Sequence, residues 1–193
     1  GMSYVELKEY KLAIENLKQA KILYYKTHDA RSISIIANQI AQAYFESYKH
    51  DDAIKEFKEI LNMPQERLPI DVKANTYKYL GQIYDYRAQF KQAIIYYIRA
   101  LDYFSVLKDT ENIAELHSKI GLLYDDIEDF EKAIQHYNES LALYKKLGQK
   151  SHYVATLSNL AAVNYEIGFK SKAISYYKQT LAIDTELENF EAV

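Results

Sequence analysis

The sequence predicts an all-α protein, a right-handed α-α superhelix (solenoid) of about five helical hairpins in a single domain. Its 193 residues include only two prolines and five glycines, which favours long uninterrupted helices. One hairpin cannot bury both of its apolar faces, so hairpins of this kind must stack on their neighbours. The dipeptide Ala-Ile marks the repeat because it recurs at a constant interval of 40 residues, at Ala13-Ile14, Ala53-Ile54, Ala93-Ile94, Ala133-Ile134 and Ala173-Ile174.

Three further columns of residues keep the same register. The small residues of the first column would let two helix backbones approach closely, and the bulky residues of the other columns would fill the remaining space. The columns are Gly1, Ala41, Gly81, Gly121 and Ala161; then Tyr4, Tyr44, Tyr84, Tyr124 and Asn164; and then Leu17, Phe57, Tyr97, Tyr137 and Tyr177.

The apolar spacing of three and four residues predicts two helices in each unit. Asp109 and Ser151 are predicted N-caps, Gly148 a helix terminator, and Met63 to Leu68 a longer connection bracketed by Pro64 and Pro69. First helices are predicted over about 1–8, 31–47, 70–86, 110–126 and 151–167, and second helices over about 11–27, 51–62, 91–107, 131–147 and 171–187. The units run over about 1–29, 30–69, 70–109, 110–149 and 150–188, and 189–193 begins a further helix.

Composition excludes several classes of function. The formal charge is −3 without a basic stripe, which argues against nucleic-acid binding, and no apolar run is long enough to span a membrane. The absence of cysteine removes thiolate sites. No phosphate loop, nucleophile elbow or dinucleotide fingerprint is present, so we expect neither catalysis nor a cofactor. The histidines show no metal-binding spacing, and they are His28, His50, His117, His136 and His152.

Two segments resemble the signature of the tetratricopeptide repeat. These are Leu80-Gly81-x-x-Tyr84 with Ala93-x-x-x-Tyr97, and Ile120-Gly121-x-x-Tyr124 with Ala133-x-x-x-Tyr137. The usual period of that family is about 34, and its closing proline is missing here except at Pro64. The longer unit resembles the repeats of kinesin light chains, of bacterial peptide-pheromone receptors and of sensor domains on bacterial histidine kinases.

The resemblance implies that the first helices line a concave groove that receives an extended peptide. Amide side chains suit this role because each can donate to and accept from a peptide backbone, whereas an ordinary solvated face is the alternative. The matching positions are Asn38, Gln42 and Phe45; Asn75, Lys78, Gln82 and Asp85; Ser118, Lys119, Leu122 and Asp125; and Ser158, Asn159, Ala162 and Tyr165.

Charge in the predicted groove bears on the kind of ligand. Only Lys78 and Lys119 could clamp a terminal carboxylate, as some family members do, so such a clamp is not favoured. The acidic residues suit a basic or neutral ligand better, and they are Asp85, Asp125, Asp126 and Glu166.

Tyrosine accounts for 20 residues, and most of those in the repeated columns are predicted to pack between helices. Where two tyrosines are adjacent in the sequence, their two side chains cannot both point into one interface. Tyr96 and Tyr176 are therefore predicted to be partly exposed, either as half-buried helix surface or as an outer contact strip.

These observations predict a non-catalytic scaffold for a protein or peptide ligand, in bacterial signalling or regulation. The alternatives are the regulatory or sensor part of a larger enzyme or transcription regulator, linked to a phosphatase or histidine kinase, and a self-association module that forms a homo-oligomer. Gly1 falls in a mid-helix column and Phe190, Ala192 and Val193 resemble the start of a sixth unit, so we expect a segment of a longer protein. The alternative is an added Gly1 before a natural Met2. The expected compartment is the cytoplasm, with the periplasm as the alternative.

Overall fold

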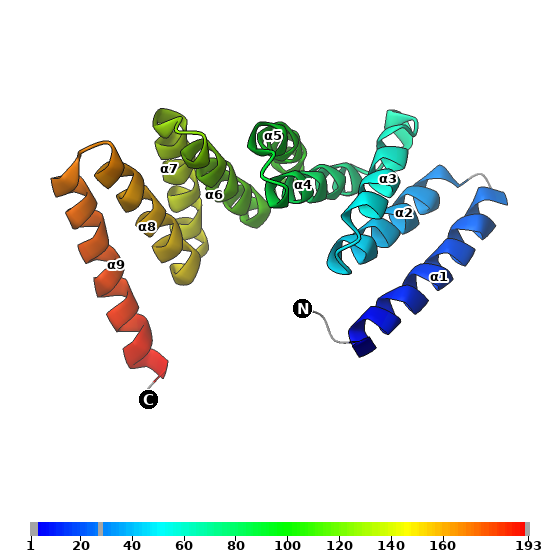
Figure 1. Cartoon of the computed structure of the whole chain (residues 1–193), viewed down its shortest axis with the longest axis horizontal. Helices are drawn as coiled ribbons and strands as arrows, with labels where there is room; N and C mark the ends of the chain where they lie inside the picture. Colours follow the sequence, from blue (N-terminus) through cyan, green and yellow to red (C-terminus); the bar gives the residue numbers. More distant parts are fainter. Residues whose placement is uncertain (1–3, 27–28, 192–193) are drawn as a thin grey trace. The chain divides into compact units, whose positions relative to one another are not determined.

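The computed structural model describes residues 4–26 and 29–191, and all of its regular elements are helical (Figure 1). This confirms the predicted all-α repeat. The elements are α1 (Tyr4–Lys26), α2 (Ala30–Glu46), α3 (His50–Leu61), the short 3-10 helix η1 (Gln65–Arg67), α4 (Ile70–Tyr86), α5 (Phe90–Leu107), α6 (Thr110–Asp126), α7 (Phe130–Leu147), α8 (Lys150–Glu166) and α9 (Lys170–Glu191).

The chain divides into two compact units, Gly1–Tyr103 and Phe104–Val193. The first unit holds α1 to α4 and most of α5, and the second holds the end of α5 with α6 to α9. We call α2, α4, α6 and α8 the first helices of their hairpins, and the other α-helices the second helices. The single continuous domain stays a prediction.

A left-handed residue makes the turn inside each hairpin. Tyr48, Ala88, Glu128 and Gly168 have φ angles of 59°, 54°, 61° and 90°. Two backbone bonds close each turn, for example from Glu128 N to Asp125 O and from Asp129 N to Tyr124 O, both 2.8 Å. These bonds satisfy carbonyls that the end of the helix would otherwise leave unpaired. The turn at Glu128 lies between the helices predicted over 110–126 and 131–147.

Of the three residues predicted to cap or end a helix, two are confirmed and one is wrong. Asp109 caps α6 by accepting from Asn112 N at 3.1 Å, and Gly148 ends α7 with a φ of 69°. The predicted cap Ser151 is wrong, because α8 already begins at Lys150 and Gln149 occupies its N-cap position. The left-handed Gly148 ends α7 so sharply that the chain re-enters a helix two residues later.

The connection between α3 and α4 keeps the 40-residue period although α3 is short. Helix α3 has 12 residues, whereas α5, the corresponding helix of the next hairpin, has 18. The loop after α3 therefore occupies positions that are helical in α5. Pro64 explains this difference, because a proline and the residue before it disfavour continuing a helix. Leu68, only 5% exposed, returns this loop to the core.

The first predicted hairpin is wrong, because Tyr4–Lys26 is one continuous helix. A separate arm before residue 9 would be too short to be stable alone, whereas extending an existing helix adds a hydrogen bond without a new nucleation cost. Ala13 is consequently exposed, while Ala53 is buried among Ala37 and Ala41 of α2. Ile14 still packs on Ile40 of α2.

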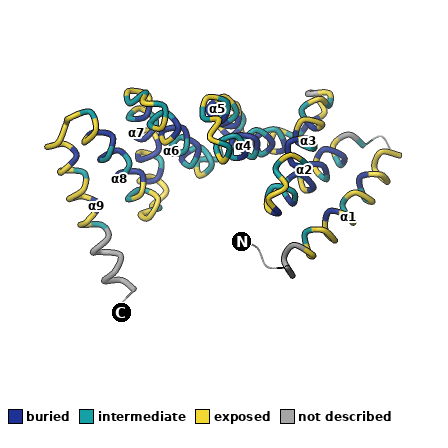
Figure 2. Tube along the Cα trace, viewed as in Figure 1, coloured by how far each residue is buried: buried dark blue, intermediate teal, exposed yellow. Residues whose placement is uncertain are grey.

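The core repeats the contact between a small residue and an aromatic ring. Tyr97 and Tyr137 are fully buried, and their rings lie directly over Gly81 and Gly121. A Cβ atom on Gly121 would lie 2.7 Å from Cδ1 of Tyr137, closer than atoms pack. Buried residues alternate with exposed ones along each helix, as expected for helices that pack against a neighbour on one side (Figure 2). The packing predicted for these two tyrosines is confirmed.

The last helix differs from its predicted role. Tyr177, predicted to pack, is 45% exposed, and Ile174 and Leu181 on the same side of α9 are 54% and 67% exposed. No described helix covers this side of α9. Helix α9 also continues through Glu191, so no break at 189 is present. The predictions for Gly1, Ala192 and Val193 lie outside the described residues.

Replacement of Gly121 by leucine should lower the free energy of unfolding by about 1–3 kcal/mol or more, because the side chain would enter space filled by the Tyr137 ring. Urea denaturation measures the loss. Gln135→Leu introduces the same side chain at an exposed position of α7 and should stay within about 0.5 kcal/mol of the parent. Equal stability of parent and Gly121→Leu would show that the helices do not meet at this glycine.

Candidate peptide-binding faces

The predicted groove residues of the first unit lie on one side of α2 and one side of α4. Asn38, Gln42 and Phe45 are spaced by four and three residues on α2, so they share one face of that helix. Their counterparts on α4 have the same helical spacing and are Asn75, Lys78, Gln82 and Asp85. All seven side chains are half-buried, and we call them the α2/α4 face.

Two amide oxygens on the α2/α4 face have no partner. Oδ1 of Asn38 and Oε1 of Gln82 are buried but accept no hydrogen bond within the described residues. Two other amides are used locally, because Gln42 donates to Glu46 at 2.8 Å and Asn75 donates to Asp71 O at 2.9 Å. A buried acceptor without a donor costs about 1–3 kcal/mol, so these two oxygens would gain from an incoming N–H group.

Phe45 belongs to an aromatic cluster that the sequence did not indicate. Its ring stacks on His50 with centroids 5.5 Å apart and contacts Tyr79 at 5.4 Å. His50 in turn meets the edge of Tyr86 at 4.8 Å, and Tyr86 is 72% exposed. Phe45 therefore supports the end of the α2/α4 face, and the exposed Tyr86 extends it.

In the second unit, the predicted residues lie on α6 and α8, and we call them the α6/α8 face. The hydroxyls of Ser118 on α6 and Thr156 on α8 are 3.3 Å apart, which joins the two helices at this side. Leu122 and Tyr165 are 41% and 57% exposed. The half-buried members are Ser118, Lys119, Asp125, Ser158, Asn159 and Ala162.

Two polar members of the α6/α8 face are used inside the unit. Ser158 donates to Val154 O at 3.0 Å, so its hydroxyl supports its own helix. Nζ of Lys119 lies 3.8 Å from a carboxylate oxygen of Glu115, so this cation has a partner on its own helix.

An acidic group ends both helices of the α6/α8 face. Asp125 and Asp126 stand at the end of α6, and Glu166 ends α8. Burial raises the pKa of Asp125 to about 6, and the negative charges of Glu166 and Asp126 add to this effect. The three carboxyls are therefore close enough to interact.

The hydroxyl of Tyr137 reaches this acidic group from the core. Burial raises its pKa, and the charges of Asp125, Asp126 and Glu166 raise it further. The side chain is fully buried and its hydroxyl has no hydrogen-bond partner among the described residues. In the equivalent place of the first unit, Tyr97 donates to Asp85 at 3.4 Å.

Two histidines that are far apart in the sequence meet in the second unit. Nδ1 of His117 on α6 lies 3.0 Å from Nδ1 of His136 on α7, and Tyr124 stacks on His136 at 5.5 Å. Burial lowers the pKa of both imidazoles, and the neighbouring His117 helps to lower that of His136 to about 4. One ring must donate while the other accepts, so the contact requires a neutral imidazole.

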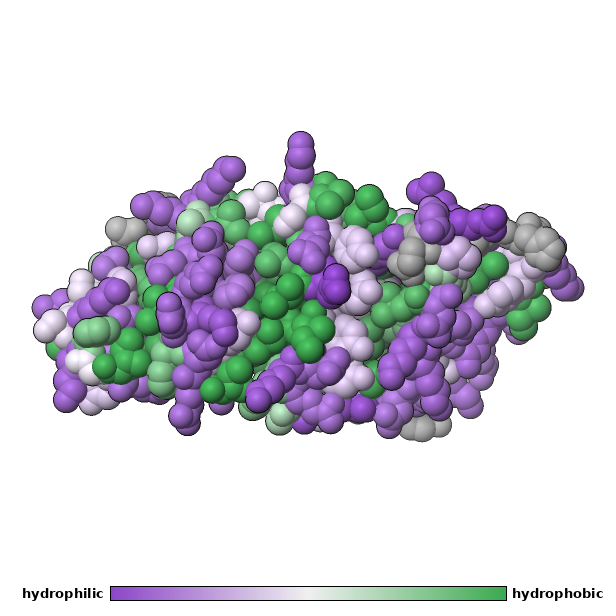
Figure 3. Space-filling model, turned by 90° about the horizontal axis from the view of Figure 1, so that it is seen from above, coloured by the Kyte–Doolittle hydropathy of each residue, from purple (hydrophilic) through white to green (hydrophobic). Residues whose placement is uncertain are grey.

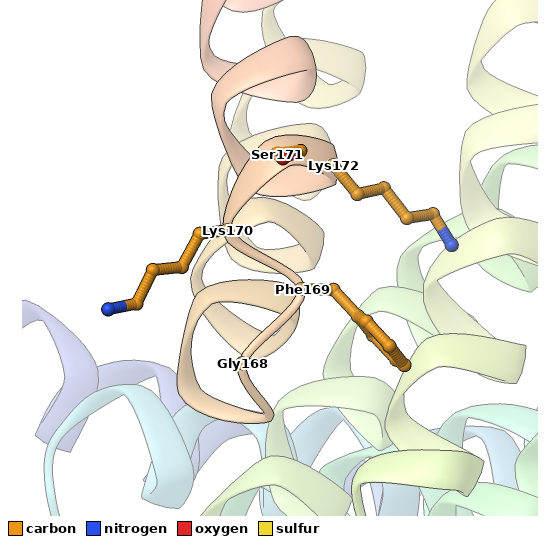
Figure 4. A pocket seen from close by; sticks show the side chains of 5 residues that line it. All are labelled: Gly168, Phe169, Lys170, Ser171 and Lys172. Carbon is orange, nitrogen blue, oxygen red and sulfur yellow. The ribbon is translucent and has the colours of Figure 1, made fainter.

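A surface hollow of about 500 Å³ lies at the turn before α9 and is lined by Gly168 to Lys172 (Figure 4). Phe169 and Lys172 point to one side of this turn and Lys170 to the other. Phe169 is 61% exposed. The hollow is open and its charged side chains diverge, so it offers no converging set of groups for catalysis.

Three features concern the surface and other kinds of site. Apolar side chains appear as patches among hydrophilic ones on the face shown in Figure 3. Within residues 4–26 and 29–191, no helix combines the length and the apolar character needed to cross a membrane. The same residues contain no group of three or more His, Asp or Glu side chains placed to hold a metal ion.

Known structures share this architecture. BtubC (BKLC) from P. vanneervenii is 18% identical with a TM-score of 0.74, over 94% of this chain and 73% of that one. A putative kinesin light chain from Podosopora anserina with TPR-like repeats is 15% identical with a TM-score of 0.72, over 93% and 89%. The apo form of RapI is 18% identical with a TM-score of 0.78, over 93% of this chain and 50% of RapI.

These likenesses define the class: the chain has the fold of an all-α helical-repeat protein. Residues 112–186 match the sequence model of the tetratricopeptide repeat, so the repeats of this segment are tetratricopeptide repeats. The structural likenesses extend the same fold over the remaining residues. No protein with a curated description matches the sequence. Tetratricopeptide repeats generally serve as protein-interaction scaffolds without catalytic activity.

The histidine pair should make stability depend on pH. Below the ordinary imidazole pKa the unfolded chain binds protons that the folded pair resists, so the free energy of unfolding should fall as the pH drops from about 6.5 toward about 4. Allowing for solvent screening, we expect a loss on the order of 1 kcal/mol. Urea unfolding across this pH range measures it.

In the double variant His117→Gln, His136→Gln, most of this decrease in the free energy of unfolding at low pH should disappear. Asp125 acts in the opposite direction, because its raised pKa makes its ionisation unfavourable to the fold as the pH rises toward neutrality. The double variant should therefore show a flat or reversed slope. An unchanged slope would mean that other groups cause the pH dependence.

Removal of the Tyr137 hydroxyl should leave stability unchanged or raise it by up to about 1 kcal/mol, because Tyr137→Phe removes a buried group without a partner. Tyr97→Phe is the matched comparison and should be destabilised by up to about 1 kcal/mol, since it loses the contact with Asp85. Thermal or urea unfolding of both variants tests the difference. A larger loss in Tyr137→Phe would reveal a hydrogen bond of that hydroxyl.

Proposed function

We propose that the chain is a non-catalytic scaffold whose α2/α4 and α6/α8 faces each bind an extended segment of a partner protein, in bacterial signalling or regulation. The observation that carries this proposal is the pair of unpartnered amide oxygens on the α2/α4 face, Oδ1 of Asn38 and Oε1 of Gln82. They come from two first helices, α2 and α4, at positions that the resemblance to tetratricopeptide repeats assigns to a ligand.

An extended peptide fits these two oxygens. Its backbone N–H groups point alternately to either side, so one strand can donate to acceptors on two adjacent helices. Each new bond would contribute about 0.5–1.5 kcal/mol net. The exposed Leu122 and Tyr165 on the α6/α8 face supply apolar contact of the kind that side chains of such a segment can bury.

A second candidate function is that of a sensor within a larger regulatory protein. A signal transduction ATPase (STAND) protein from Pyrococcus horikoshii, which carries a tetratricopeptide repeat sensor, is 18% identical with a TM-score of 0.73. The chain covers 30% of that protein and 50% of RapI. A helical-repeat segment of this fold thus occurs as part of longer chains, which supports a regulatory role beside an effector domain.

A third candidate function, self-association, is supported by the exposed side of α9. Ile174, Tyr177 and Leu181 form an exposed apolar stripe on α9. The same columns are buried or half-buried in the preceding hairpin, where Ile134, Tyr137 and Leu141 belong to the core. A second copy that covered the stripe would make a homo-oligomer. The cytoplasm as the compartment, and the absence of catalysis, stay predictions.

Affinity capture with the triple variant Asn38→Ala, Lys78→Ala, Gln82→Ala tests the proposal. The parent should retain a partner from its native lysate, and the variant should recover at least about tenfold less, since it loses several hydrogen-bonding groups of one face. Mass spectrometry compares the two recoveries.

The matched control changes the same residue types on exposed positions outside the face, as Asn62→Ala, Gln89→Ala and Lys91→Ala. This control should capture the partner as the parent does. Equal recovery by the parent and both variants would reject the α2/α4 face as the binding surface. Circular dichroism of each variant establishes that it is folded.

A further inference from the structure

The ends of α6 and α8 carry negative charge where a helix disfavours it. The C-terminal end of a helix has a partial negative charge from its unpaired carbonyl groups, so basic residues stabilise the last turn. Neither helix has a basic residue there. Instead, Asp125, Asp126 and Glu166 stand together at these two ends. Both the carboxylates and the helix dipoles therefore attract a cation to one place.

This acidic group has no counterion in the second unit. Asp125, Asp126 and Glu166 form no ion pair with the described residues, and no basic side chain lowers the pKa of Asp125. Acidic residues elsewhere do have partners: Arg87 pairs with Asp51 at 2.8 Å, and Lys132 pairs with Asp129. Asp125, Asp126 and Glu166 therefore lack the counterion that Asp51 and Asp129 have.

The hydroxyl of Tyr137 is a second, independent feature of the same place. Its ring passes over Gly121 of α6, and its hydroxyl is influenced by all three carboxyls yet has no hydrogen-bond partner among the described residues. A buried polar atom without a partner costs stability unless a ligand satisfies it. The first unit differs at the equivalent place, because Tyr97 donates to Asp85.

Exposed apolar side chains adjoin the acidic group. Leu122 lies one turn before Asp126 on α6, and Tyr165 precedes Glu166 on α8. With exposed fractions of 41% and 57%, both can cover an alkyl stem or an apolar neighbour of a charged side chain. A metal ion would gain nothing from the apolar side chains of Leu122 and Tyr165. The described residues also contain no group of His, Asp or Glu side chains placed to hold a metal ion.

We infer that the α6/α8 face binds a lysine or arginine side chain of the partner segment, held by Asp125, Asp126, Glu166 and the hydroxyl of Tyr137. This inference rests on the proposed function and names its ligand chemistry. The aliphatic stem of the basic side chain lies along Leu122 and Tyr165. The charged head pairs with the carboxylates and donates to the Tyr137 oxygen.

Selection from a displayed library of random peptides of about 12 residues tests the inference on the full chain. Three targets are compared: the parent, the face variant Asp126→Asn, Glu166→Gln, and a control with the same charge change, Glu128→Gln, Glu131→Gln. All four positions are exposed, so each variant should fold. The parent and the control should enrich peptides rich in lysine or arginine.

A selected basic peptide, made with a fluorescent label, should bind the face variant about tenfold more weakly than the parent, and its affinity should fall as salt rises from about 50 mM to about 500 mM. Enriched peptides without a basic excess, or equal binding to the face variant, would overturn this inference while leaving the proposed function intact. Enrichment of no peptide by any target would contradict both.

Discussion

The fold depends on a close approach of helix backbones at one repeated point, where a tyrosine ring crosses a glycine. Gly81 and Gly121 allow the rings of Tyr97 and Tyr137 to lie against the backbone of the first helix. Where the column holds Ala41, the residue of the ring column is the buried Phe57, and where it holds Ala161, the corresponding Tyr177 is 45% exposed. The small residue thus faces a buried ring in the three hairpins that begin with α2, α4 and α6, and this contact fixes how their two helices pair.

The same contact links the core to the surface. A tyrosine that crosses the first helix carries its hydroxyl toward the carboxyls at the end of that helix, so the core delivers a polar atom to the position where a ligand is proposed to lie. In the first unit the hydroxyl is used by Asp85, and in the second it reaches carboxyls that have no counterion among the described residues. Like charges at helix ends reduce stability. A cost of this kind, concentrated on one face of a folded scaffold, is typical of a surface shaped by recognition.

Local patterns predicted most of the fold. The constant register of Ala-Ile placed four hairpins to within a residue at nearly every boundary, and the Asp109 cap and Gly148 stop followed from side-chain chemistry and backbone freedom. The continuous α1 could not be predicted from the register, because helix propagation there overrides the repeat. The pairing of His117 with His136, and the cluster of His50 with Tyr86, join residues from different helices. Such contacts depend on how helices pack, which spacing along one helix does not encode. The candidate faces were predicted as sets of positions, while the unpartnered atoms within them required the structure.

The left-handed turn inside each hairpin also governs how the chain can change length. Two backbone bonds close every turn around a single residue, and three of the four turns tolerate a side chain in a conformation that glycine adopts more readily. Such a turn has no room for an inserted or deleted residue. The connection from Met63 to Leu68 shows the contrasting behaviour, because it trades helix for loop without disturbing the hairpins on either side. Natural variation in length, and engineered insertions of tags or epitopes, should therefore be tolerated in the connection from Met63 to Leu68 and rejected in the left-handed turns, which also join hairpins at Lys108 and Gly148.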